Sequence, residues 1–142
     1  MQIIYVLCGI PASGKSTLAN ELSMKFNATV HHFDDIPGAN RKESNGQAYE
    51  EFWRRIRNDL LNGKSVIADG IHTSKSLRMK ILNAVNEIEC KKVLIVMNTP
   101  LEECLRRNAN RKPRLSDFCI LAIHEKQEAP TLDEGWDEII WR

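Results

Sequence analysis

An eight-residue stretch near the start of the chain constrains the fold more than any other feature of the sequence. Residues 9–16 read G-I-P-A-S-G-K-S, which matches the pattern G-x-x-x-x-G-K-[ST]. The stretch lies directly after the apolar run 2–8 and directly before a helical period that begins near Lys15. A loop that wraps a triphosphate turns its amide N–H groups inward, which requires glycine conformations at its ends. The sequence therefore predicts a nucleotide site at a strand-to-helix turn.

This loop supplies most of the predicted nucleotide-binding residues, which are Gly9, Ala12, Ser13, Gly14, Lys15, Ser16 and Thr17. The helix after the loop adds its partial positive charge, Lys15 reaches the β- and γ-phosphates of ATP, and the Ser16 hydroxyl binds Mg²⁺. The loop alone leaves open where the γ-phosphate goes, because switches, motors and kinases all share it. A glycine-rich turn with an incidental lysine is the alternative interpretation.

Segments of strand and helix character alternate along the rest of the chain. Apolar runs of strand length occupy residues 2–8, 29–33, 65–68, 93–97 and 137–141. Helical periods begin near residue 15, cover 49–60 and 77–88, begin again at Pro100, and recur near 117–127. This alternation is typical of an α/β fold with a parallel sheet covered by helices. Because 142 residues support one core and no linker or repeat interrupts them, we expect one domain over residues 1–142.

Composition narrows the possible environments and partners. The net charge of +1 does not indicate a protein that coats nucleic acid, so a partner of that kind has to be held locally. Because no apolar run reaches membrane length and the N-terminus lacks the layout of a secretion signal, we expect a cytoplasmic protein without membrane contact. The four cysteines have no C-x-x-C spacing, and we expect them to be reduced and buried.

Acidic residues end two of the predicted strands. Asp34 and Asp35 end the second strand, and Asp69 ends the third. In an open α/β sheet the ligand lies beyond the carboxyl ends of the strands. We therefore predict that Asp34 or Asp35 accepts the proton of an attacking hydroxyl, and that Asp69 holds Mg²⁺ together with Ser16. In each case, an aspartate that only forms a turn or caps a helix is the alternative.

The densest positive charge lies in residues 106–114, where five of nine residues are basic and none is acidic. On a helix Arg107 and Arg111 would lie one turn apart on one face, so that both could bind one anion. A run of this kind is usually a solvated face. Beside a phosphate loop it is favoured as a lid that closes over the nucleotide and places arginine against the transferring phosphate.

Together these motifs resemble those of P-loop kinases of the polynucleotide 5′-hydroxyl kinase family. The likeness rests on G-I-P-A-S-G-K-S-T, F-D-D, G-K-S-V-I-A-D-G-I-H-T-S-K-S-L-R, R-R-N-A-N-R and, at residues 128–139, E-A-P-T-L-D-E-G-W-D-E-I. The resemblance implies a three-layer P-loop NTPase fold, with an adenylate-kinase-like sheet of five parallel strands and an arginine-rich lid. It also implies that Asp34 is the general base and that Arg107 and Arg111 are the lid arginines.

Two departures from that family's pattern concern the acceptor. The places where family members commonly carry arginine around the base hold Phe33 and Ile36-Pro37, and Arg41 is the nearest substitute. The family's D-x-T-N becomes residues 69–72, D-G-I-H. Among the residues outside the loop and the lid, we assign Asp35, Arg41 and Arg78 to substrate binding.

Three functions are compatible with these features. The leading hypothesis is Mg²⁺- and ATP-dependent transfer of the γ-phosphate to the 5′-hydroxyl of a polynucleotide or nucleotide, with Asp34, Lys15 and Arg107 as catalytic residues. A metabolite kinase that phosphorylates a small alcohol is the first alternative, since gluconate and shikimate kinases share the fold and the lid. A nucleotide-dependent regulatory ATPase or binding module is the second. The sequence leaves the oligomeric state open.

Overall fold

The computed structural model describes residues 1–39 and 45–142 of the chain. Its strands are β1 (Ile3–Cys8), β2 (Thr29–His32), β3 (Val66–Asp69), β4 (Lys91–Val96) and β5 (Glu138–Trp141). Its helices are α1 (Lys15–Phe26), α2 (Asn45–Leu61), α3 (Lys75–Val85), α4 (Leu101–Ala109) and α5 (Asp117–Glu125), with short 3-10 turns η1 (Phe33–Asp35) and η2 (Leu132–Glu134). Each predicted strand and helix has a counterpart within a few residues.

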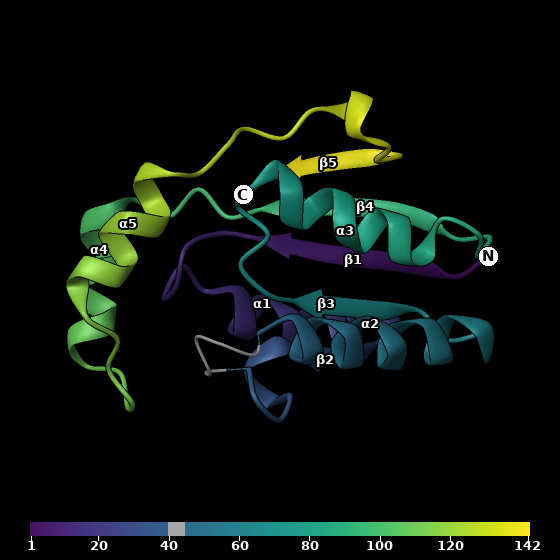
Figure 1. Cartoon of the computed structure of the whole chain (residues 1–142), viewed down its shortest axis with the longest axis horizontal. Coiled ribbons are helices and arrows are strands. Elements are labelled where there is room, and N and C mark those ends of the chain that lie inside the picture. The colour runs from purple at the N-terminus through teal and green to yellow at the C-terminus, as the bar shows by residue number, and fades with distance from the viewer. Residues whose placement is uncertain (40–44) are drawn as a thin grey trace.

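The strands form one parallel sheet in the order β2-β3-β1-β4-β5, which has five strands within the described residues (Figure 1). The apolar sequence I-I-Y-V-L-C places β1 at the centre, because a strand with helices on both faces buries every side chain. The predicted α/β fold with a five-stranded parallel sheet is confirmed.

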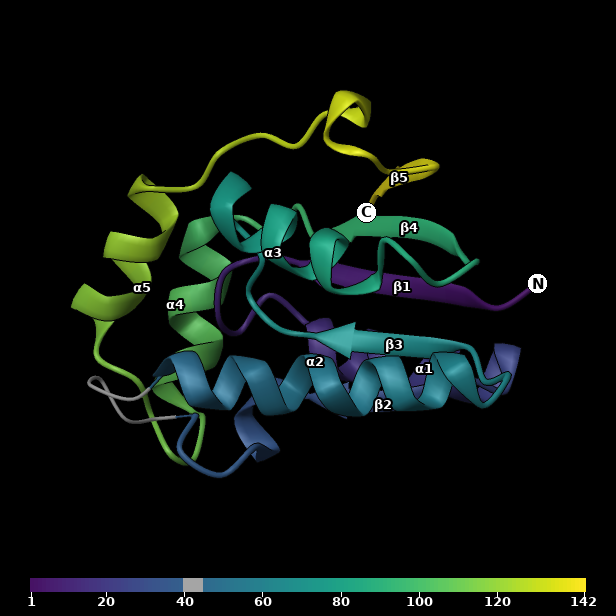
Figure 2. The same cartoon turned by 45° about the vertical axis from the view of Figure 1, so that its right-hand side comes forward.

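The helices cover the sheet in two layers (Figures 1 and 2). Leu18, Ala19 and Leu22 of α1 pack on one face of the sheet, against a cluster that includes Leu7 and Ile67. On the opposite face α2 and α3 bury the side chains Phe52, Ile56, Leu60, Ile81, Leu82 and Val85. The result is the expected three-layer arrangement, with the sheet in the middle.

Helices α4 and α5 stand apart from these layers, beyond the carboxyl ends of the strands (Figure 1). Buried Cys104 of α4 and Ile120 of α5 pack with Ile10 from the loop after β1. The Thr99 hydroxyl also donates a hydrogen bond to the carbonyl oxygen of Ser13, over 2.7 Å. These contacts fix the two helices against the phosphate loop.

Helix α4 ends at Ala109, so the expectation that Arg107 and Arg111 lie one turn apart on a helix is wrong. The cause is Asn108, which is fully buried. Its amide nitrogen donates to the carbonyl oxygen of Leu115 (2.7 Å), and its amide oxygen accepts from the Leu115 N–H (3.1 Å). These two bonds hold the chain in a reversal after α4.

The ends of two other helices follow the sequence signals. Ser74 caps α3, because its hydroxyl oxygen accepts a hydrogen bond from the N–H of Leu77 (3.2 Å). Gly63 has φ +82° just after α2, a left-handed conformation that glycine adopts without strain. No helix within residues 1–39 and 45–142 is long and apolar enough to cross a bilayer.

Candidate active site

The loop between β1 and α1 has the backbone of an anion cradle. Gly14 directly precedes α1 in the left-handed region, with φ +97°. Gly9 has no room for a side chain, since a Cβ there would lie 2.6 Å from Ser13 Oγ and 3.0 Å from Met97 Cβ. Gly14 therefore has the left-handed conformation expected of a loop glycine, whereas Gly9 has an ordinary φ and is required for lack of space.

The Lys15 side chain folds into this loop and is buried. Its Nζ donates hydrogen bonds to the carbonyl oxygens of Gly9 (2.8 Å) and Ile10 (2.9 Å), which are two of the three that an ammonium can donate. Burial lowers the pKa of Lys15, and the negative charges of Asp69 and Asp34 oppose that effect. Nearby, Ser13 Oγ is buried without a hydrogen-bond partner among the described residues. A buried cation beside an unpaired donor is the electrostatic environment of an anion site.

Asp69 lies at the centre of a second group of polar side chains. The Ser16 hydroxyl donates to Asp69 Oδ2 over 2.8 Å, and Nδ1 of His32 lies 2.6 Å from the same oxygen. The parallel register pairs His32 with Asp69, so neighbouring strands end at the same level. The structure thus brings both predicted metal ligands together and adds His32, which no motif or spacing indicated.

Asp34 lies in the 3-10 turn η1 directly after β2, and its side chain is 71% exposed. Its Oδ2 lies 3.7 Å from a guanidinium nitrogen of Arg111. In the last turn of α4, Arg107 lies against the loop, because one of its terminal nitrogens is 3.4 Å from where a Cβ on Gly14 would be. Asp34 therefore pairs with one lid arginine, Arg111, while Arg107 lies against the loop and also pairs with Glu103 over 3.0 Å.

Aromatic rings flank Asp34. The rings of Phe33 and Tyr49 stack at a centroid distance of 4.2 Å with an interplanar angle of 17°. Burial raises the pKa of Tyr49, and the nearby Asp34 carboxylate raises it further. At the place where the polynucleotide kinase pattern has an arginine, this chain therefore has Phe33, which also packs edge-on against buried Phe52.

The structure does not bring all predicted substrate residues to this site. Arg78 is fully buried, and its guanidinium donates to both carboxylate oxygens of Glu134, over 2.8 and 3.0 Å. Because this pair closes Arg78 off from any substrate, we correct its assignment to a structural role. Asp35 is exposed in η1, and Thr17 is exposed in the first turn of α1. Arg41 lies outside the described residues.

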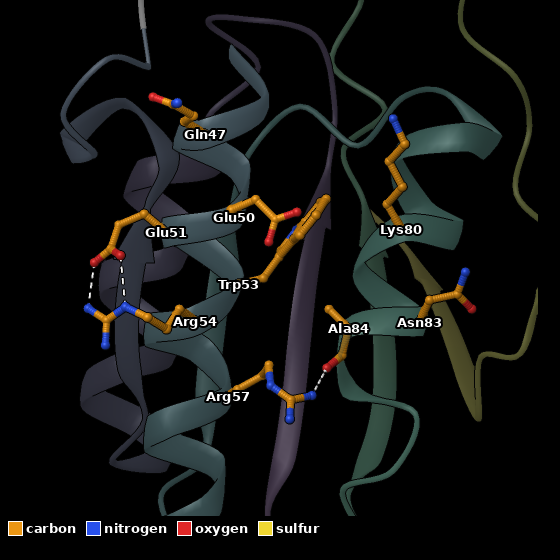
Figure 3. A pocket seen from close by; sticks show the side chains of 9 residues that line it. All are labelled: Gln47, Glu50, Glu51, Trp53, Arg54, Arg57, Lys80, Asn83 and Ala84. Atoms are coloured by element: carbon orange, nitrogen blue, oxygen red, sulfur yellow. Dashed lines mark hydrogen bonds and ion pairs between the residues drawn. The ribbon is translucent and has the colours of Figure 1, made fainter. Parts of the chain in front are cut away.

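The arginines of α2 do not extend the positive charge of the lid. Arg54 and Arg55 both donate hydrogen bonds to Glu51, and Arg57 pairs with Glu87 on the far side of a groove. The groove has a volume of about 820 Å³ and lies between α2 and α3, with Trp53 pointing into it (Figure 3). No residue of the phosphate loop lines this groove, and acidic side chains already pair with its arginines. Both arginines of the groove are therefore compensated by neighbouring carboxylates.

A buried histidine lies behind the loop. His72 has φ +47°, and its Nδ1 lies 2.9 Å from the carbonyl oxygen of Leu7, to which it donates. Burial lowers the pKa of His72 to about 4 from an ordinary value of 6.5. The folded state then binds this proton less tightly than the unfolded state, so the contribution to stability is complete above pH 6.5 and declines as the pH falls towards 4.

We expect this histidine to make folding sensitive to acid. At pH 5 its contribution is reduced by about 2 kcal/mol relative to pH 7. The variant His72→Asn should lose that dependence, because asparagine tolerates a left-handed backbone and can donate to Leu7. Urea unfolding of both proteins at pH 7 and pH 5 measures the difference. Equal acid sensitivity in the two proteins would contradict the prediction.

The strand order, the loop after β1 and the arginine-bearing segment after β4 define a P-loop kinase-like protein. A protein-family model described as "Chromatin associated protein KTI12" matches residues 1–140, so the chain belongs to the KTI12 family.

The comparisons with known proteins agree with this class. L-seryl-tRNA(Sec) kinase of Methanococcus maripaludis is 29% identical over 144 residues, covering 95% of this chain and 56% of the relative. Kti12 of Chaetomium thermophilum, solved in complex with ADP-AlF3, is 16% identical with a TM-score of 0.73, covering 98% of this chain and 88% of the other. A fungal RNA kinase is 17% identical with a TM-score of 0.68, covering 99% of this chain and 38% of the other.

These matches refine the resemblance found in the sequence. They support the predicted P-loop kinase class, but they do not point specifically to the polynucleotide kinase/phosphatases. The chain spans about half the length of the curated relative that it matches. The two structures, both below 25% identity, show the fold.

Proposed function

We propose that this protein transfers the γ-phosphate of ATP to a hydroxyl group that an RNA carries, either its own 5′-hydroxyl or one on an attached amino acid. The observation that carries the proposal is the position of Asp34, which meets Arg111 at 3.7 Å and contributes to the electrostatic environment of Lys15. A carboxylate beside a phosphate cradle is placed to accept the proton of an attacking alcohol.

Each residue of the site has a role in this reaction. The loop amides and Lys15 bind the triphosphate, while Arg107 and Arg111 stabilise negative charge on the transferring phosphate. Asp34 orients the acceptor hydroxyl and takes its proton as the bond to phosphorus forms. The leaving group is ADP.

The donor set fits Mg²⁺, which prefers oxygen ligands from hydroxyl and carboxylate groups. Ser16 and Asp69 would hold the ion, because their side chains already meet over 2.8 Å. When bound, Mg²⁺ neutralises part of the charge on the phosphate oxygens.

Two observations favour an acceptor attached to RNA. The curated relative is named for a seryl-tRNA substrate, and one neighbouring structure is an RNA kinase. Partly exposed Phe33 and Tyr49 lie near Asp34, and we propose that a nucleic-acid base contacts them there.

Radiolabelled ATP tests the proposal directly. The protein is incubated with Mg²⁺ and, separately, with 5′-hydroxyl RNA, 5′-hydroxyl DNA, seryl-tRNA, gluconate and shikimate. We expect label to appear in an RNA-linked acceptor. Label in gluconate or shikimate alone would establish the metabolite kinase instead.

The KTI12 match favours a second candidate, a nucleotide-dependent regulatory ATPase that transfers nothing to an organic acceptor. This candidate predicts that ATP is hydrolysed at the same rate with and without each acceptor. It also predicts that Asp34→Asn leaves biological function intact while Lys15→Ala abolishes it.

Both candidates require Lys15 for nucleotide binding. We expect Lys15→Met to weaken ATP binding about 100-fold, because hydrogen bonds to charged groups contribute roughly 1.5–3 kcal/mol. Isothermal titration calorimetry measures the affinity, and a thermal melt checks that the variant folds. Lys126→Met, on an exposed residue at the end of α5, is the control and should bind ATP normally. Unchanged affinity in Lys15→Met would place the nucleotide elsewhere.

A further inference from the structure

His32 belongs to the candidate site but comes from neither the loop, the lid nor the acidic strand ends. It is the last residue of β2, and the register of the parallel pair sets it opposite Asp69. Its Nδ1 lies 2.6 Å from Asp69 Oδ2. Because a carboxylate oxygen accepts, Nδ1 carries the hydrogen and donates it.

Two donors converge on this one oxygen. The Ser16 hydroxyl also bonds Asp69 Oδ2, over 2.8 Å. The hydrogen bonds given by the described residues to this carboxylate therefore occupy Oδ2 and leave Oδ1 open. These two bonds restrict the rotation of the Asp69 carboxylate. The Asp69 side chain is also only 8% exposed, so surrounding atoms restrict it further.

We propose that His32 is a positioning residue, whose Nδ1–H holds the Asp69 carboxylate in the orientation needed to bind Mg²⁺ with the nucleotide. The inference rests on the proposed function, because it takes Asp69 as a ligand of that ion. Hydrogen bonds to a metal-binding carboxylate hold the ligand in place before the ion arrives, which increases affinity.

The neighbouring residue provides a matched control. His31 makes the same kind of contact on the opposite face of β2, where its Nε2 lies 2.7 Å from Asp59 Oδ2. This pair is also largely buried, with side chains 16% and 15% exposed. Asp59 belongs to α2, and the hydrogen bonds and ion pairs among the described residues join it to neither the loop nor Ser16. A variant of His31 therefore loses a histidine–carboxylate bond of β2 without touching the candidate Mg²⁺ site.

Asparagine and glutamine variants separate a positioning role from mere packing. The amide nitrogen of asparagine can take the place of Nδ1, whereas that of glutamine reaches towards the place of Nε2, which makes no bond to Asp69. His32→Asn should therefore keep the hydrogen bond, and His32→Gln and His32→Leu should lose it. His31→Leu is the control.

The measurement is the Mg²⁺ dependence of ATP binding, taken as the ratio of dissociation constants without and with Mg²⁺ by calorimetry. In His32→Leu and His32→Gln we expect this ratio to fall about tenfold, the lower end for the loss of such a partner. His32→Asn and His31→Leu should keep the wild-type ratio. Circular dichroism confirms folding, and if His32→Leu does not fold, the Asn and Gln variants still decide the question.

The possible failures are distinguishable. A wild-type ratio that depends on Mg²⁺ and is the same in all His32 variants overturns the positioning role and leaves the proposed function standing. Equal loss in the Asn and Gln variants also overturns it, because packing would then explain the effect. A wild-type protein whose ATP binding ignores Mg²⁺ removes the Mg²⁺ site itself, and the inference with it.

Discussion

Replacing Asp34 with asparagine is expected to lower kcat for phosphoryl transfer about 1,000-fold, in the middle of the range for loss of a general base. Asparagine keeps the shape of the side chain but cannot take the acceptor's proton. Asp34 contacts Arg111 rather than the loop, so ATP affinity should change less than about threefold. Single-turnover transfer of labelled phosphate and calorimetric ATP binding measure the two quantities separately.

The neighbouring acid offers a control for this variant. Asp35 follows Asp34 in the same exposed 3-10 turn, and Asp35→Asn removes the same charge at nearly the same distance from the sheet. It should keep kcat within about tenfold, because the proposed base remains and the exposed charge that is removed is screened by solvent and salt. Equal loss in both variants would show that η1 contributes negative charge and not a specific base. Full activity in Asp34→Asn would remove Asp34 from the reaction.

The second large effect concerns stability. We expect Arg78→Ala to reduce the free energy of unfolding by about 3–5 kcal/mol. The variant leaves the buried Glu134 carboxylate without its positively charged partner. Glu134 accepts both guanidinium bonds and also a bond from the Trp136 indole N–H (3.0 Å), so three residues depend on the arrangement. Urea unfolding at pH 7 measures the loss.

An exposed ion pair supplies the comparison. Arg114 and Asp117 meet at 3.3 Å with side chains about half exposed, and such pairs contribute less than about 1 kcal/mol. Arg114→Ala should therefore be close to wild type in the same titration. If Arg78→Ala were no more destabilising than Arg114→Ala, the buried pair would not hold the segment around η2 to α3.

The sequence was sufficient for the architecture because that information is local. The run before Gly9 is apolar and β-branched, the loop has its glycines at fixed spacing, and Pro100 marks where a helix begins. Periodicity and turn chemistry of this kind need no knowledge of distant contacts.

The remaining errors come from contacts between residues that lie far apart in the chain. Arg78 bonds Glu134, which lies 56 positions further along the chain. From the sequence, a substrate-binding arginine could not be distinguished from one that forms a buried ion pair. The chain reversal after α4 depends on the hydrogen bond from Asn108 to Leu115. The spacing of the basic residues in this segment suggests a continuous helix and does not predict that bond. His32 contacts Asp69 only because β2 lies beside β3. The local sequence of either strand does not reveal which strands are neighbours in the sheet.

If the proposed transfer takes place at Asp34, its contact with Arg111 has a consequence for which acceptors can react. A hydroxyl that reaches Asp34 takes over a position where the carboxylate now faces a guanidinium at 3.7 Å. An acceptor with a phosphate beside its hydroxyl brings a replacement anion for that arginine, so the exchange leaves both charges compensated. A neutral polyol brings none. For the proposed reaction we therefore expect an anionic group next to the reactive hydroxyl to favour an acceptor over a neutral one.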